Sequence, residues 1–193
     1  MRIYGLCFIL MSMPLVALAH EEKGAASGFA AGVHHPISGL DHVLAMLAVG
    51  LWGAQLGQPA MWVLPVAFPM VMAFGGMLGL LGVPIPGVEI GIALSAVVLG
   101  AMVLTEARPP LWVAAIVVGL FAIFHGHAHG TELPDGASGL TYSIGFVIAT
   151  GLLHATGIAI GLVHRWKPGK VALRACGALV ALGGVYFLWQ AFA

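Results

Sequence analysis

Long apolar runs separated by short polar breaks dominate this chain. A membrane-spanning helix needs about 20 consecutive apolar residues. The runs reach that length at 32–57, 60–82, 87–105, 111–129, 138–163 and 171–193. Proline pairs or polar loops close most of them, for example Pro84 and Pro86 after the second. The pattern therefore predicts an all-α membrane protein in which residues 20–193 form a single six-helix transmembrane bundle.

The first segment is typical of a cleavable signal peptide. Arg2 supplies a short positive region, residues 3–18 form an apolar region, and Ala17-Leu18-Ala19 fits a cleavage site. The alternative is an uncleaved first membrane helix, for which the run is rather short. We expect a signal peptide at 1–19, whose removal leaves His20 at the mature N-terminus.

The basic residues predict the orientation in the membrane. Cleavage places the mature N-terminus outside, so that alternate loops are cytoplasmic. Those loops contain most of the basic residues of the mature chain, namely Arg108, Arg165, Lys167, Lys170 and Arg174. Cytoplasmic loops carry an excess of Lys and Arg. We therefore expect a multi-pass protein of the bacterial inner (cytoplasmic) membrane with both termini periplasmic.

The composition excludes several classes of protein. Of 193 residues, 61% are hydrophobic, 7% are charged and the net charge is zero, whereas about a quarter of a soluble domain is charged. The solvent of this chain must be mostly lipid, and no nucleic-acid partner is expected. The two cysteines, Cys7 and Cys176, cannot provide a disulfide framework or a thiolate metal site in the mature chain.

The first group of candidate functional residues opens the first predicted span. Ionisable residues in membrane spans are costly and by default suggest function. Pro36 suits a first helical position, and His35 and His42, seven positions apart, would share one helix face. Asp41 would point about 100° away, toward a neighbouring helix. It could ligate a cation or orient a histidine, or an Asp41–His42 pair could only lock helices together.

The second group closes the fourth predicted span. His125, His129 and Glu132 lie at i, i+4 and i+7, on one face if the helix continues, and His127 faces the other way. Imidazoles at i and i+4 are a common metal-chelating arrangement. Small residues between the histidines leave room for a ligand or for a close helix. The alternative is a histidine patch exposed to water at the membrane surface.

Two isolated ionisable residues are harder to interpret. His154 lies inside the fifth predicted span, on a face with Thr150, Gly157 and Gly161. Small residues favour tight packing, so a core role and a role in a metal pathway are equally supported for His154. Glu89 opens the third predicted span, where a solvated helix N-terminus is the simpler interpretation.

Both histidine groups lie at the outer ends of predicted spans, so their helices can converge. They would then form one site from the following residues: His35, Asp41, His42, His125, His127 and His129. Neutral imidazoles with one or two carboxylates suit Ni²⁺, Co²⁺, Cu²⁺ or Zn²⁺, whereas Ca²⁺ and Mg²⁺ prefer more oxygen ligands.

The chain resembles the HupE/UreJ family at these residues. The resemblance rests on His35-Pro36-x-x-Gly39-x-Asp41-His42 and on Phe124-His125-Gly126-x-Ala128-His129-Gly130-x-Glu132. It implies a secondary nickel permease (cobalt in some members), with a hydrogenase or urease maturation system downstream. It also implies metal-binding roles for a defined set of residues: His35, Asp41, His42, His125, His129 and Glu132.

The favoured hypothesis is therefore a secondary transporter, not an enzyme, that moves a divalent transition metal, most of all nickel, with release inward past His154. The sequence contains no G-x-x-x-x-G-K-[ST] phosphate loop with which to use ATP. Three alternatives remain: a membrane protein that only binds, stores or senses metal, a metal-dependent hydrolase, and a haem-binding cytochrome. The expected partners are the metal ion and the bilayer, with a homo-oligomer left open.

Overall fold

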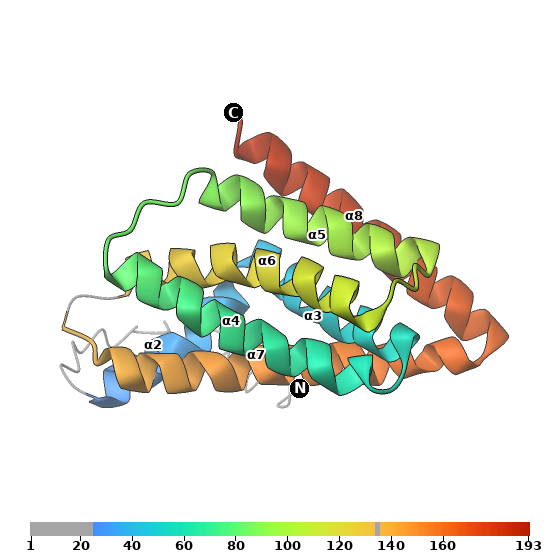
Figure 1. The fold of residues 1–193 in the computed structure, drawn as a ribbon, viewed down its shortest axis with the longest axis horizontal. Helices are drawn as coiled ribbons and strands as arrows, with labels where there is room; N and C mark the ends of the chain where they lie inside the picture. Colours follow the sequence, from blue (N-terminus) through green and yellow to red (C-terminus); the bar gives the residue numbers. More distant parts are fainter. Residues whose placement is uncertain (1–24, 134–135) are drawn as a thin grey trace, which may run out of the picture.

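The computed structural model describes residues 25–133 and 136–193, and the regular elements in these ranges are all helical. In chain order they are α2 (Ala25–Ser38), α3 (Leu40–Leu56), α4 (Ala60–Leu80), α5 (Val88–Thr105), α6 (Leu111–Thr131), α7 (Gly139–Gly161), the 3₁₀ turn η1 (Leu162–Arg165) and α8 (Lys167–Gln190). Figure 1 shows these helices as an elongated bundle. The predicted signal peptide at 1–19 and His20 lie outside the described residues.

Helices α4 to α8 agree with the five later predicted spans. Within the described residues, five helices are long and apolar enough to cross a membrane, and a sixth span results if α2 and α3 count as one broken span. The all-helical membrane fold is thus confirmed, with five to six spans.

The first predicted span needs correction, because it is not one helix over 32–57. Residues 28–38 and 40–56 meet at an angle of 80°. Helix α2 begins at Ala25, so Pro36 lies inside it and not at a first helical position. Pro36 has no N–H for the helix ladder, and Gly39 adopts an extended conformation (φ −91°, ψ 110°). A Cβ on Gly39 would lie 2.9 Å from Asp41 Oδ1, so glycine leaves room for that carboxylate.

Helix α3 is the centre of the bundle. It contacts α2, α4, α5, α7 and α8, and every residue from 48 to 55 is buried. A helix that is hydrophobic all round is expected in such a buried position. The outer helices instead expose large apolar side chains such as Trp62, Met70 and Trp112, which would face lipid. The middle and C-terminal part of α3 is therefore held deep among the other helices, whereas its N-terminal end, where Leu40 is exposed, lies nearer the surface.

Glycine contacts bring α4 and α6 together along their length. A Cβ on Gly126 would collide with the carbonyl oxygen of Met72, and one on Gly130 would collide with that of Gly76. Gly79, on the α4 side, meets the His127 carbonyl in the same way. Small residues let membrane helices approach backbone to backbone. This contact fixes the rotation of α6 and hence the direction of its histidines.

The opposite end of the bundle is held by side-chain caps on α5. The last carbonyls of a helix have no partner within it. Here Gln55 Nε2 donates to Val103 O and Arg174 Nε to Leu104 O, each at 3.0 Å. Trp52 Nε1 donates to Ala107 O, just after the helix, also at 3.0 Å. The α5–α6 and α7–α8 connections, which carry or adjoin the basic residues of the described chain, lie at this end (Figure 1). The histidine-rich end of α6 is at the other.

We predict that Gly126→Ala destabilises the protein, because the new methyl group would force α4 and α6 apart. Overpacking typically costs about 1–3 kcal/mol. The matched control is Gly151→Ala, since Gly151 is exposed and a Cβ there meets nothing within 4 Å. Thermal unfolding of the purified protein in detergent measures both. Equal unfolding temperatures for the two variants would contradict the packing role of Gly126.

Candidate metal centre

At the end of α6, histidines alternate with small residues. The two kinds of residue therefore face different neighbouring helices. Gly126 and Gly130 lie against α4. His125 and His129 are buried, at 0% and 5% exposure, and their rings contact those of α2 and α3 residues. The expectation that small residues between the histidines admit a close helix is confirmed, and that helix is α4.

Four imidazole rings from three helices meet at this end of the bundle. The ring of His129 lies 4.6 Å from that of His35 and 4.6 Å from that of His42, between centroids. His42 is in turn 4.7 Å from His125. The two histidine motifs therefore converge, as their positions predicted. With Asp41 and Glu132 they form what we call the outer cluster: His35, Asp41, His42, His125, His129 and Glu132.

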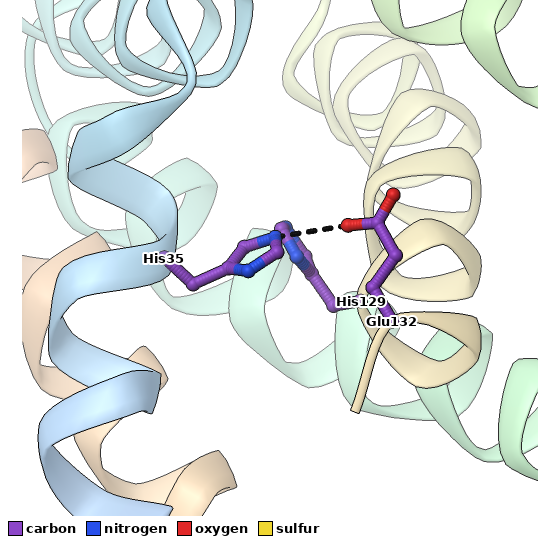
Figure 2. Close-up of side chains that lie close together, drawn as sticks. All are labelled: His35, His129 and Glu132. Atoms are coloured by element: carbon purple, nitrogen blue, oxygen red, sulfur yellow. Dashed lines mark ion pairs between the residues drawn. The ribbon is translucent and has the colours of Figure 1, made fainter. Parts of the chain in front are cut away.

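The most exposed part of the outer cluster joins α2 to the end of α6. His35 Nε2 lies 3.1 Å from Glu132 Oε2, with His129 beside them (Figure 2). One ligand atom from each of His35, His129 and Glu132 falls within 4.8 Å of the others. The side chains of His35 and Glu132 are 28% and 51% exposed. A cation could thus reach these three groups directly from solution.

Asp41 orients the histidine next to it. Its Oδ1 accepts from the backbone N–H of His42 at 2.8 Å and lies 3.0 Å from ring Nδ1. The expectation that Asp41 points to another helix was therefore wrong, because Gly39 lets its carboxylate fold back over the start of α3. A carboxylate can only accept, so Nδ1 carries the proton and Nε2 keeps its lone pair. That buried Nε2 has no hydrogen-bond partner among the described residues.

Ser95 orients His125 in a similar way. The Ser95 hydroxyl donates its one proton to the Ile92 carbonyl at 2.6 Å. Its oxygen lies 2.9 Å from His125 Nε2, so it must accept from an Nε2–H there. The lone pair of His125 then sits on Nδ1, which is buried without a partner in the described part of the chain. Ser95 is not among the residues predicted from the sequence, where its only signal is a hydroxyl in an otherwise apolar span.

His129 is the least satisfied member of the outer cluster. Both of its ring nitrogens are buried, and neither has a hydrogen-bond partner within the described ranges. Buried polar groups are normally hydrogen-bonded, so exceptions call for an explanation such as an ion. With the free nitrogens of His42 and His125, the cluster presents several unsatisfied ring nitrogens next to two carboxylates. This is the arrangement that a borderline divalent metal would complete.

The remaining candidate residues lie outside the outer cluster. The expectation that His127 joins the same site needs correction: its ring lies on the other face of α6, and its Nε2 donates to the Val83 carbonyl at 2.7 Å. His154 is buried deeper in the bundle, with the ring of Phe68 beside it. Glu89, expected to be a simple solvated terminus, lines a cavity of about 250 Å³ together with four members of the outer cluster: His35, Asp41, His42 and Glu132.

The electrostatics of this end favour a cation. Asp41, Glu89 and Glu132 lie on the same cavity, and the C-terminal end of α6, with its partial negative charge, lies beside it. The lysines and arginines of the described ranges all lie at or after residue 108, near the opposite connections. A dication bound at the outer cluster would therefore be attracted by these negative charges and would neutralise them.

Comparisons with known proteins found one matching family and a similar relative. The family model described as "HupE / UreJ protein" matches residues 8–187. A similar relative is "Protein HupE" of Rhizobium leguminosarum bv. viciae, 47% identical over 180 residues, which cover 93% of this chain and 94% of the relative. No solved structure matches the chain.

We predict that Ser95→Ala weakens nickel binding, because His125 Nε2 would lose its acceptor and the ring its fixed orientation. Loss of such a supporting contact typically lowers metal affinity by about 10–100-fold. Thr156→Val is the matched control, since Thr156 is exposed and its hydroxyl bonds only the Leu152 carbonyl of its own helix. Calorimetric titration of the purified protein with Ni²⁺ measures both. Equal affinities would remove Ser95 from the metal centre.

Proposed function

Because the chain belongs to the HupE/UreJ family, we propose that it is a secondary transporter that carries a divalent transition metal, nickel above all, across the inner membrane. The family is a membrane-protein family linked to nickel and cobalt uptake, of transporter type and not of enzyme type. In this proposal the outer cluster captures the ion, and the ion is the substrate and not a resident cofactor.

One observation carries the proposal: at one end of a membrane bundle, next to carboxylates, three buried histidines with unpartnered ring nitrogens have neighbouring rings. An imidazole nitrogen with a free lone pair is a ligand for nickel, cobalt, copper or zinc. Magnesium and calcium prefer a shell of oxygens, of which this cluster offers few. The ligand chemistry thus supports a borderline metal, and the family link supports nickel first and cobalt second.

The charge distribution supports inward movement. If the basic end of the bundle is cytoplasmic, as the positive-inside rule expects, the outer cluster faces the periplasm. A membrane potential of about 100 mV is worth about 2.3 kcal/mol per charge, and so about twice that for an entering dication. Uptake in this proposal needs no ATP, and a hydrogenase or urease maturation system downstream would take up the delivered metal.

The outer cluster can also transfer a bound ion toward the interior of the bundle. Glu132 and His35 are the exposed members, His129 and His42 lie next, and His125 is fully buried. Successive rings are separated by 4.6 to 4.7 Å. An ion can therefore exchange ligands in small steps, without leaving one partner before meeting the next. We place capture at His35 and Glu132, and transfer at His42 and His125.

Haem ligation is not favoured by the geometry. A haem iron held by two histidines requires one ring on each face of the macrocycle. The adjacent rings of the outer cluster are only 4.6 or 4.7 Å apart, which leaves no room for a porphyrin between them. A colourless purified protein is the expected result.

We predict that proteoliposomes containing the wild-type protein take up radioactive Ni²⁺ under an imposed membrane potential, and that Asp41→Ala and His42→Ala abolish this uptake. Both changes remove a ligand or its orienting group, for which a loss of at least about tenfold is expected. His34→Ala is the control, since His34 is exposed on α2 next to His35. Its uptake should equal that of the wild type.

Two results would contradict the proposal. Correctly folded wild-type protein that binds nickel but does not transport it would favour a binding or storage role. Uptake that survives both substitutions would place the path away from the outer cluster. An excess of Co²⁺ should compete with Ni²⁺ in this assay, and an equal excess of Mg²⁺ should not.

A further inference from the structure

A second polar group lies deeper in the bundle, around His154 on α7. Its side chain is 1% exposed, and neither ring nitrogen has a hydrogen-bond partner among the residues described. Burying an unpaired polar group costs free energy. Small residues on this face predicted tight packing, and Gly50 and Gly157 do bring α3 and α7 into contact. This packing explains the position of α7. It does not account for an imidazole with two unused nitrogens.

Thr150 presents a second unused group on the same face. It lies one turn before His154, and residues at i and i+4 have Cβ atoms about 5–6 Å apart. Thr156, on the exposed side of α7, bonds the carbonyl four residues earlier at 2.8 Å. Thr150 is completely buried, yet its hydroxyl has no partner in the described part of the protein. Its oxygen is therefore available to a ligand next to the imidazole.

Helix α4 adds a backbone oxygen. Residue 69 is a proline and has no N–H, so the Pro65 carbonyl lacks its usual partner in the helix. The His154 ring faces the backbone of Pro65, without a contact that meets hydrogen-bond geometry. His154 thus has an unpartnered ring nitrogen beside the Pro65 backbone, and Thr150, one turn earlier on the same helix, has an unpartnered hydroxyl. An imidazole nitrogen, a hydroxyl and a carbonyl can each bind a cation.

Phe68 lies beside both this region and the outer cluster. Its side chain is fully buried, and its ring lies 5.6 Å from the ring of His125 and 5.3 Å from that of His154. An apolar ring in this position interrupts the series of imidazoles. Phe68 lies between Pro65 and Pro69, where α4 lacks the backbone N–H groups of both prolines. Such a segment bends more easily than a regular helix, so the ring can move with it.

We propose that His154 and Thr150, with the Pro65 carbonyl, form an inner binding station for a partly dehydrated divalent cation, and that Phe68 is the barrier between this station and the outer cluster. The inference rests on the proposed transport function and deepens it. The station offers one nitrogen and two neutral oxygens, so it holds the ion less tightly than the outer cluster. Movement of the Phe68 ring transfers the ion from His125 to His154.

The first test replaces the proposed ligand by a softer one. In protein whose Cys7 and Cys176 are both alanine, His154→Cys puts a thiolate at the station. Thiolates favour soft metals, so uptake into proteoliposomes should shift from Ni²⁺ toward Cd²⁺ by about tenfold or more. The cysteine-free parent is the control. An unchanged ratio of Cd²⁺ to Ni²⁺ uptake would overturn the ligand role of His154, because a packing role does not depend on metal softness.

The second test changes the barrier. Phe68→Leu should leave nickel affinity at the outer cluster unchanged and increase the rate of Ni²⁺ uptake, because a smaller and more flexible side chain obstructs less. Phe74→Leu is the matched control, since Phe74 lies on the same helix with 52% of its surface exposed. Equal uptake rates in the two variants would overturn the barrier. This test also decides the proposal if the cysteine variant does not fold.

The proposed transport function and the proposed inner station can be tested separately. If the wild-type protein shows no Ni²⁺ uptake, the transport function itself fails. If the wild type transports and the outer cluster binds nickel, but the His154→Cys variant keeps its selectivity and Phe68→Leu behaves like Phe74→Leu, only the inner station fails.

Discussion

The contact between the glycines of α6 and the backbone of α4 decides where the histidines of α6 can point. Gly126 and Gly130 meet the carbonyl oxygens of Met72 and Gly76 so closely that no other residue fits. Because side chains on a helix have fixed angular positions, this contact turns His125 and His129 toward α2 and α3. In lipid no hydrophobic effect drives helices together, so close van der Waals packing at this interface has to hold them. The metal centre thus depends on residues that bind no metal.

A mostly apolar and nearly uncharged interior makes the orientation of each ring important. In water an imidazole can exchange its proton and rotate freely, whereas in the bundle each nitrogen must be matched to a donor or an acceptor. Asp41 fixes the ring of His42, and Ser95 fixes that of His125. In both cases the lone pair is left on the nitrogen without a partner in the described residues. These unmet hydrogen bonds cost stability, and in return the centre is already arranged for a metal.

The sequence predicted the helices better than it predicted their contacts. Hydropathy located α4 to α8 because each carries a long apolar run between polar breaks, and the spacing of His125 and His129 placed them on one face. The 80° bend at Gly39 was missed, since residues 32–57 have the length of one span, and the polar residues around Gly39 were interpreted as functional side chains and not as a break in the helix. Ser95 and Phe68 could not be recognised, because a hydroxyl and a phenyl ring gain their roles only from neighbours on other helices.

A transporter must bind its ion well enough to remove water from it and loosely enough to release it. In the proposed path the outer cluster would meet the first requirement, with carboxylates to neutralise the charge and several imidazoles to replace the lost water. If the next ligands bound the ion equally tightly, the ion would not be released. His154 and Thr150 present fewer and weaker ligands, and Phe68 stands before them. In the proposed path, a strong outer site followed by a weaker inner one would let the membrane potential supply the difference, so that the ion would leave toward the cytoplasm and not backward.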